Sequence, residues 1–339
     1  MNKAILLFGG KSDERFVSVA SAQNLATQYS FDELWYIFET NQICKVDLNT
    51  LKSHQNPFKS KFLPQNPHFT DSIQNAIPYL KDKTVFIGLH GTEGEDGTIQ
   101  KLFETEKIAF TGSGSKSSQI CFQKHLAKEI LQKVNIKGAP QIIIDIKNDL
   151  DFESKIFSFL EQNNKIVIKP VANGSSIGLE IVADKKALEQ SIINLNKSNQ
   201  SHFLLEKFIK GRELTITIIN HRSKDIALPP SEVLTTEGSA FDYDGKYLGK
   251  NTTEITPAQI TNEQKQKAQL LALKAHQELG CYGYSRTDVI LTESELYFLE
   301  TNTLPGMTKA SFVPQQLAVE NILLKDFLQE QLKLAQARY

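Results

Sequence analysis

Short runs of apolar and β-branched residues alternate with helical stretches along this 339-residue chain, and this alternation strongly constrains the fold. The first run, residues 4–8, ends at Gly9 and Gly10, and a helical stretch follows around residues 18–28. Alternating strands and helices are typical of α/β folds, in which helices cover a sheet. The chain is therefore predicted to be an α/β protein. Further strands are expected at residues 85–89, 142–144, 165–169, 179–182, 203–209 and 214–219, and helices at residues 117–134 and 262–279.

The length and local composition suggest how the chain is divided into domains. At about 150 residues per domain, the length corresponds to two or three domains. Small residues dominate residues 111–115 and indicate one boundary there. Residues 41–80 are rich in Asn, Lys, Gln and Pro and are expected to form a variable surface excursion. We expect three domains: a Rossmann-like N-terminal one over residues 1–112, a central one over residues 113–206 and a C-terminal one over residues 207–339.

The charge balance and the cysteines bound the function. The chain has 38 basic and 39 acidic residues and a formal net charge of -1, which provides no electrostatic reason to bind nucleic acid or a membrane surface. A small-molecule substrate is therefore expected. Cys44, Cys121 and Cys281 lie far apart and form neither a disulfide framework nor a metal-binding pair. We expect a cytoplasmic protein.

Two glycine-containing segments are similar to nucleotide-binding motifs but lack a required residue. Residues 10–12 read Gly-Lys-Ser, but a P-loop needs a glycine five residues earlier, where Ile5 stands. Residues 112–114 begin like a dinucleotide fingerprint, but the third glycine position is Ser117. Neither segment is expected to bind a nucleotide in the manner of its motif.

Residues 174–178, Gly-Ser-Ser-Ile-Gly, match the nucleophile elbow of serine hydrolases. An elbow needs a helix after the turn, whereas residues 179–182 are a predicted strand, which disfavours a hydrolase acting through Ser176. A small loop between two strands can instead close over a polyphosphate, with Lys169 at the strand end as a point charge. The alternative is a solvated hairpin with an exposed lysine.

The segment with the most chemical information is a predicted hairpin formed by residues 283–291 and 296–302. If Thr292 pairs with Leu296, alternation along the strands places four polar side chains on one face. These are Arg286 opposite Asn302 and Asp288 opposite Glu300. Two carboxylates and an amide suit a hard cation such as Mg²⁺, and the arginine suits charge on a transferring phosphoryl group. The alternative is a structural network of the arginine and the two acids.

Four motifs, in this order, resemble the ATP-grasp enzymes, and within them the D-alanine–D-alanine ligase family. The likeness runs from Gly9 to about Pro314. It implies three α/β domains with ATP held between the central and C-terminal ones. It also implies that ATP phosphorylates one D-alanine and that the amine of a second D-alanine then attacks, supplying a peptidoglycan precursor. The motifs are residues 166–170 (IVIKP), 174–178 (GSSIG), 286–288 (RTD) and 299–308 (LETNTLPGMT).

The resemblance also implies substrate and catalytic residues, position by position. Glu14 would hold the ammonium group of the first D-alanine, and His90 would lie near the same substrate. Gly306 and Ser311 would bind the carboxylate of the second D-alanine. The implied catalytic residues are Glu14, Ser175, Tyr247 and Arg286, of which the first three would form a hydrogen-bonded trio beneath a lid at residues 241–247.

The cofactors and partners implied by the resemblance are ATP, two Mg²⁺ or Mn²⁺ ions, and a second copy of the chain in a homodimer. Asp288, Glu300 and Asn302 would bind the metal ions. Lys309 leaves the second substrate open, so a D-alanyl–D-lactate ligase is the alternative within this class. A nucleotide-binding regulator without turnover is disfavoured by the intact polar set on the hairpin. The implied ATP-binding residues are Lys124, Lys169, Ser176, Glu206, Lys207, Glu213 and Lys246.

Overall fold

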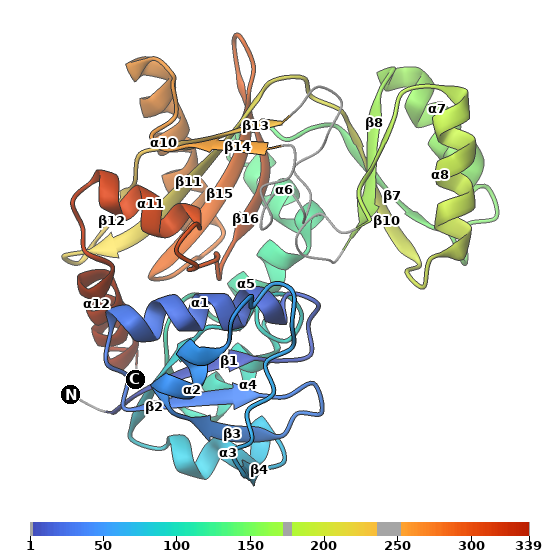
Figure 1. Cartoon of the computed structure of the whole chain (residues 1–339). Coiled ribbons are helices and arrows are strands. Elements are labelled where there is room, and N and C mark those ends of the chain that lie inside the picture. Colours follow the sequence, from blue (N-terminus) through green and yellow to red (C-terminus); the bar gives the residue numbers. More distant parts are fainter. Residues whose placement is uncertain (1–2, 172–177, 236–251, 339) are drawn as a thin grey trace.

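The computed structural model describes residues 3–171, 178–235 and 252–338, which form three β-sheets with helices packed around them (Figure 1). The alternation in the sequence predicted this α/β class. Ser175, Ser176, Lys246 and Tyr247 lie outside the described residues, so their roles stay predictions.

The N-terminal sheet has the strand order β4-β3-β2-β1-β5-β6, with parallel pairing from β2 through β6 and antiparallel pairing at β2–β3 and β3–β4. Its central strands are buried on both faces, because the side chains of residues 5–8 are 0% exposed. The strands are β1 (Lys3–Gly9), β2 (Glu33–Ile37), β3 (Ile43–Val46), β4 (His68–Thr70), β5 (Lys83–Ile87) and β6 (Ala109–Phe110). The helices are α1 (Arg15–Gln28), α2 (Leu48–Ser53), α3 (Ile73–Leu80) and α4 (Thr98–Glu106).

The expectation of a surface excursion over residues 41–80 was wrong. This segment contributes β3, β4, α2 and α3, and β3 and β4 extend the sheet by two antiparallel strands. Several of its apolar residues are buried, since Ile43, Cys44 and Leu51 are 0% exposed and join the N-terminal core. The abundance of polar residues around them concealed these core positions.

The helix predicted over residues 117–134 is two helices, α5 (Ser115–Phe122) and α6 (Lys124–Gln132). Gln123 between them has ψ 87°, outside the helical region, and caps the end of α5 with its backbone N–H. The break contains neither glycine nor proline, so the sequence does not mark it. Both helices pack against β16 (Leu296–Asn302) of the C-terminal sheet.

The central sheet is antiparallel with the order β7-β10-β8-β9. Helices α7 and α8 lie together on its outer side (Figure 1), where their apolar faces form one core with the strands. The elements are β7 (Gln141–Asp145), α7 (Phe152–Asn163), β8 (Ile166–Pro170), β9 (Glu180–Val182), α8 (Lys185–Lys197) and β10 (His202–Lys207).

The C-terminal sheet has the order β14-β13-β11-β15-β16, with β12 also paired to β11. Helix α10 covers one face through an apolar cluster with β11 and β15, while α12 reaches back to β5 and β6 of the N-terminal sheet. The elements are β11 (Arg212–His221), β12 (Lys224–Ala227), β13 (Ser231–Thr235), β14 (Thr252–Ile255), α10 (Asn262–Glu278), β15 (Tyr284–Leu291), β16, α11 (Phe312–Val319) and α12 (Leu324–Gln336).

Candidate active site

The β15–β16 hairpin presents the predicted polar set. Arg286 lies opposite Asn302 and Asp288 opposite Glu300, as expected from the alternation. The predicted pairing at the turn was wrong by one residue, because Leu291 rather than Thr292 lies opposite Leu296. A register shift between Asp288 and Val289 compensates for this offset, so the charged pairs still face each other.

Asp288 is buried, with 4% of its surface exposed, and is held by two neighbours. Arg286 donates through Nε to Oδ1 at 2.9 Å and through Nη2 to Oδ2 at 2.8 Å, a two-pronged pair. The Thr215 hydroxyl donates to Oδ1 at 2.5 Å from the neighbouring strand β11. These bonds fix the guanidinium and the carboxylate relative to each other on the sheet.

A cluster of lysines and glutamates, here called the lysine cluster, links the central sheet, α6 and β16. It consists of Lys124, Lys128, Lys169, Glu206 and Glu300. Lys169 Nζ lies 2.5 Å from Glu206 Oε2, and Lys124 Nζ lies 3.2 Å from Glu300 Oε2. Lys128 forms an ion pair with the other oxygen of Glu206, and this lysine and glutamate are both about 5% exposed or less. The described side chains of the cluster thus set three lysine side chains against two carboxylates.

Lys128 was missed by the sequence analysis. Burial, followed by the charge of Lys169, lowers its pKa well below the ordinary value for lysine, with Glu300 opposing and Lys124 adding to the shift. The signal that could have identified it is its spacing: it lies four residues after Lys124, on the same face of α6.

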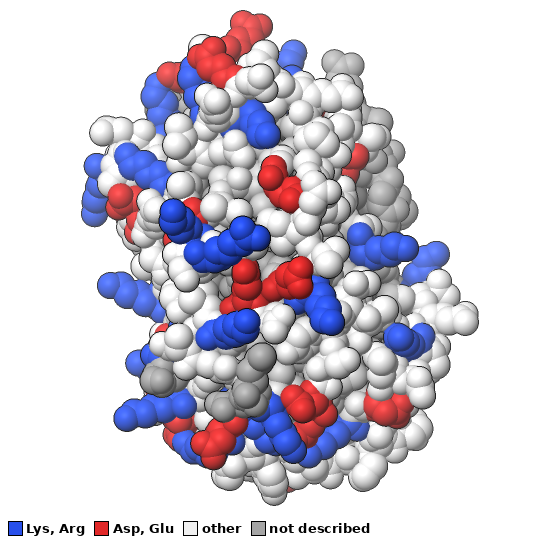
Figure 2. All heavy atoms as spheres, turned by 90° about the vertical axis from the view of Figure 1, so that its left-hand side faces the viewer, with Lys and Arg blue, Asp and Glu red and all other residues white. Residues whose placement is uncertain are grey.

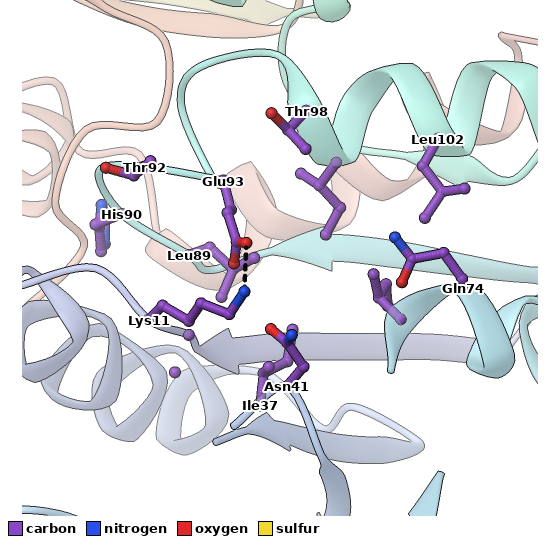
Figure 3. Close-up of a pocket in the computed structure, with 14 residues that line it drawn as sticks. Lys11, Ile37, Asn41, Gln74, Leu89, His90, Thr92, Glu93, Thr98 and Leu102 are labelled. Atoms are coloured by element: carbon purple, nitrogen blue, oxygen red, sulfur yellow. Dashed lines mark hydrogen bonds and ion pairs between the residues drawn. The ribbon is translucent and has the colours of Figure 1, made fainter. Parts of the chain in front are cut away.

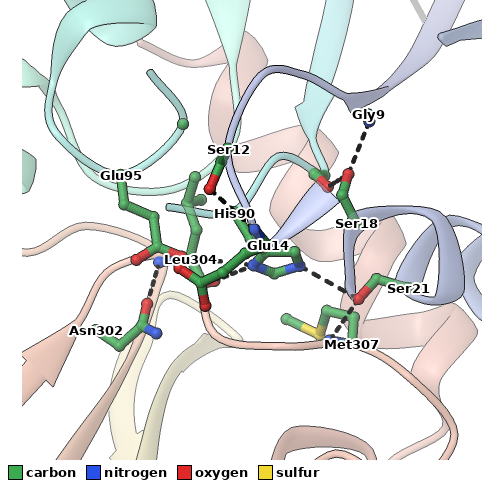
Figure 4. Close-up of polar contacts among 12 residues, drawn as sticks. Gly9, Ser12, Glu14, Ser18, Ser21, His90, Glu95, Asn302, Leu304 and Met307 are labelled. Atoms are coloured by element: carbon green, nitrogen blue, oxygen red, sulfur yellow. Dashed lines mark hydrogen bonds and ion pairs between the residues drawn. The ribbon is translucent and has the colours of Figure 1, made fainter. Parts of the chain in front are cut away.

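Figure 4 shows how His90 connects the N-terminal sheet to the loop after β16. His90 follows β5, is 5% exposed and places Nδ1 2.9 Å from the carbonyl oxygen of Leu304. Because a carbonyl only accepts, Nδ1 carries the proton, and in the neutral ring Nε2 accepts from the hydroxyl of Ser21 at 3.2 Å. Ser21 in turn accepts from the backbone N–H of Met307 at 3.2 Å. His90 and Ser21 therefore hold the ends of the segment that contains Gly306.

Glu14 lies beside this network, at the N-cap position of α1 and 6% exposed. A Cβ atom at Gly91 would stand 2.7 Å from Glu14 Oε2, and Gly91 has φ +70°, so this position requires glycine. The loops that carry Glu14 and His90 thus approach each other closely. Glu95 adds a second carboxylate, with Oε1 3.4 Å from His90 Nδ1.

The loop after β16 leads into α11 through Ser311, whose hydroxyl accepts from Thr308 N at 3.0 Å. Gly306 lies against this hydroxyl, because an added Cβ would be 2.9 Å from Ser311 Oγ. The two residues expected to bind the second substrate are therefore adjacent.

The remaining predicted residues are more dispersed. Glu213 lies on β11 opposite Ile290 of β15, on the same face of the C-terminal sheet as Asp288. Lys207 ends β10 and is exposed. The structure thus brings together the hairpin set and the lysine cluster, and separately Glu14 with His90, whereas Lys207 lies at the margin.

A cavity of about 160 Å³ lies beside His90 at the carboxyl ends of β1 and β5 (Figure 3). Lys11 and Glu93 form an ion pair across it at 3.1 Å. Lys11 is exposed and Glu93 is half-buried, and they belong to the loops that carry Glu14 and His90. The pair therefore joins these two loops on their outer side.

The donor set on the hairpin fits a hard cation by its chemistry, since carboxylate and amide oxygens are the ligands that Mg²⁺ prefers. In this structure Asp288 is paired with Arg286, Glu300 with Lys124, and Asn302 Oδ1 accepts from Leu304 N at 2.9 Å. Within the described parts of the chain, three or more histidine, cysteine or acidic side chains do not gather into a metal-binding group.

On the face seen in Figure 2, basic and acidic side chains are interspersed among uncharged ones, as expected for a net charge of -1. Among the helices that the structure describes, none combines the length and the apolar character needed to span a bilayer.

Comparison with known proteins identifies the family. The family model described as D-ala D-ala ligase N-terminus matches residues 3–113, and the model of the ligase C-terminus matches residues 130–333. The chain belongs to the D-alanine–D-alanine ligase family. The family, the fold class and the ATP-dependent ligase activity expected from the sequence are thereby confirmed.

Individual relatives cover most of the chain. The D-alanine–D-alanine ligase of Leptospira interrogans serovar Lai is 36% identical over 79% of this chain and 77% of its own. The crystal structure of the VanG D-Ala:D-Ser ligase from Enterococcus faecalis is 27% identical, with a TM-score of 0.82 over 99% of this chain and 100% of its own. The D-alanine–D-alanine ligase from Bacillus anthracis, crystallised with ATP, shares the fold with a TM-score of 0.74, 24% identity and coverage of 99% and 98%.

Proposed function

We propose that this enzyme joins two D-alanine molecules through a D-alanyl phosphate, for the synthesis of a peptidoglycan precursor. The γ-phosphoryl group of ATP is transferred to the carboxylate of the first D-alanine, which turns a poor electrophile into a reactive acyl phosphate. The amine of the second D-alanine attacks the carbonyl carbon, and phosphate leaves. The observation that supports this most is the hairpin set of Arg286, Asp288, Glu300 and Asn302 beside the lysine cluster.

The lysine cluster is the proposed site of the ATP phosphates. Lys124 and Lys169 would contact the phosphates, because each already places its ammonium group against a carboxylate of the cluster. The cluster has three lysines and two glutamates, and a bound polyphosphate would supply further negative charge to pair with the lysines. Adenine and ribose are proposed to contact Glu206 and Glu213, and Lys207, Ser176 and Lys246 are proposed as further ATP-binding residues on the family resemblance.

Asp288, Glu300 and Asn302 are the proposed ligands of two Mg²⁺ or Mn²⁺ ions. When bound, such ions would neutralise charge on the ATP phosphates. The chain's own contribution is Arg286, which Asp288 holds in a fixed orientation. A guanidinium fixed in this way can stabilise negative charge on the transferring phosphoryl group and on the tetrahedral intermediate without reorganising.

The first D-alanine is proposed to bind between Glu14 and His90, and the second at Gly306 and Ser311. Ser175 and Tyr247 are proposed to join Glu14 in closing the site under the lid at residues 241–247. A closed site would protect the acyl phosphate from water. We further propose three domains at residues 1–112, 113–206 and 207–339, with ATP between the last two, a homodimer, and a place in the cytoplasm, where ATP is available.

The test is phosphate release from ATP and Mg²⁺ by the purified protein, with mass spectrometry of the products. D-alanine should stimulate release and yield a dipeptide, whereas L-alanine should not. D-lactate and D-serine, each added with D-alanine, test the alternative second substrates, of which D-serine is suggested by the ligase from Enterococcus faecalis. Phosphate release that does not depend on D-alanine would refute the proposed substrate.

A further inference from the structure

Glu254 of β14 faces the candidate active site, although nothing in the sequence marked it. Directly opposite residues of neighbouring strands share a face of a sheet. Glu254 lies opposite Val233 of β13, and Val233 lies opposite Glu213 of β11. The same face carries Arg286 and Asp288, because Thr217 and Thr215, two and four residues along from Glu213, lie opposite them on β15.

The opposite face of this sheet is the apolar one. Leu214, Ile216 and Val289 pack there against α10, which confirms the assignment of the two faces. Glu254 is thus a carboxylate on the polar face of the sheet, on its edge strand β14.

Helix α11 places Glu254 beside the loop proposed for the second substrate. Gln315 Nε2 donates to Glu254 Oε2 at 3.3 Å and to the carbonyl oxygen of Ala310 at 2.6 Å. Ala310 adjoins Ser311, the proposed carboxylate-binding residue. Glu254 is also within electrostatic range of the Arg286 guanidinium. Glu254 is therefore near both the loop expected to bind the second amino acid's carboxylate and the group expected beside the acyl phosphate.

The second substrate arrives as an ammonium ion and must lose a proton before its nitrogen can attack. We propose that Glu254 binds this ammonium group and accepts its proton, as a further catalytic residue; this inference rests on the proposed function. The neutral amine then forms the C–N bond, the C–O bond to phosphate breaks with its electron pair, and the second nitrogen proton leaves with the phosphate. Glu254 returns its proton to solvent on product release.

The surroundings of Glu254 support a proton-accepting role. Burial raises the pKa of Glu254 to about 6, against the lowering effects of the Gln315 hydrogen bond and the Arg286 charge. The other charged groups on this face of the sheet are Glu213 of β11, Arg286 and Asp288 of β15 and Glu300 of β16. A carboxylate with such a pKa is ionised at neutral pH and is a better base than an ordinary glutamate.

The experiment compares two nucleophiles in the full-length enzyme. Hydroxylamine is uncharged at neutral pH, so it can trap D-alanyl phosphate as a hydroxamate without a base, whereas D-alanine needs one. Glu254→Gln should reduce dipeptide formation about 100-fold, within the range for a general base, and leave hydroxamate formation near the wild-type rate. It should also remove the fall in the dipeptide rate that we expect of the wild type below about pH 6. Glu263→Gln, an exposed change on α10, is the control.

Three outcomes would count against the reasoning. Equal loss of dipeptide and hydroxamate would overturn the inference, because Glu254 would then act on folding or on the first step. Retention of both would overturn it as well. A wild-type enzyme that forms no hydroxamate with ATP and D-alanine would instead overturn the proposed function on which the inference rests.

Discussion

Replacing Lys128 by methionine should have little effect on stability, although the residue is buried and charged. Removing one partner of a buried ion pair costs about 3–5 kcal/mol when it leaves the other charge uncompensated. Glu206, however, contacts two lysines, so in Lys128→Met it keeps Lys169 at 2.5 Å. The methionine can fill the vacated space with apolar contacts. We therefore expect a loss of less than about 1 kcal/mol in the free energy of unfolding without ATP.

Glu206→Gln provides the contrast. It leaves Lys128 and Lys169 facing each other without their shared carboxylate, and Lys128 is buried. The expected loss is about 3–5 kcal/mol. Thermal unfolding followed by circular dichroism should rank the midpoints as wild type, Lys128→Met and then, clearly lower, Glu206→Gln. Lys133→Met, an exposed change at the end of α6, controls for loss of a lysine.

The pH dependence provides an independent check on Lys128. Its pKa is lowered in the folded protein, chiefly by burial, so between that pKa and the ordinary lysine value the unfolded chain binds more protons. Stability from this residue must then rise with pH across that window. The wild type should gain stability relative to Lys128→Met as pH increases from 7 towards 10. The reasoning would be refuted if the unfolding midpoints of the wild type and Lys128→Met changed by the same amount at every pH. It would also be refuted if Lys128→Met lost as much free energy of unfolding as Glu206→Gln.

Three further changes test other parts of the structure. Ser21→Ala should raise the KM for the second D-alanine about tenfold, because Met307 N would lose its hydrogen-bond acceptor, and should have little effect on the KM for ATP. Ser18→Ala on the same helix is the control. Equal effects of the two changes on the KM for D-alanine would contradict the expectation. Glu300→Gln should abolish most activity at limiting Mg²⁺ with the fold retained, and wild-type turnover would refute the metal assignment. Leu51→Ala should lower the free energy of unfolding by about 2–5 kcal/mol, whereas Leu63→Ala, at a side chain 64% exposed, should change it little in the same urea titration.

The hairpin shows what periodicity can and cannot predict. Alternation placed Asp288 opposite Glu300 correctly, although the turn was predicted one residue too long. Thr292 N donates to the carbonyl oxygen of Glu295 at 2.9 Å, so the turn is tighter than expected. The register shift near Val289 offsets that error. A single-residue shift leaves no mark in the sequence, since it depends on how β16 packs against its neighbours.

The other errors have different physical causes. In residues 41–80 the core positions of β3 and α2 lie among polar residues, and the helical spacing of Ile73, Ala76, Ile77 and Leu80 was overlooked. The helix break at Gln123 follows no breaking residue, and the apolar pattern continues across it. Lys128 and Glu254 were missed because a lysine on a helix and a glutamate on an edge strand usually face solvent. Their importance arises only from what tertiary packing brings against them.

The contacts that join distant segments suggest why the three sheets must act together. Helix α6 provides lysines to Glu206 of the central sheet and to Glu300 of the C-terminal sheet, so it fixes the spacing of the two proposed ATP-binding walls. His90 of the N-terminal sheet holds the loop that carries Gly306, so the proposed sites of the first and second amino acids share one hydrogen-bonded chain. A change at either junction should therefore alter the positions of two substrates at once. Kinetic effects on both, from a residue that contacts neither, are the expected signature of this arrangement.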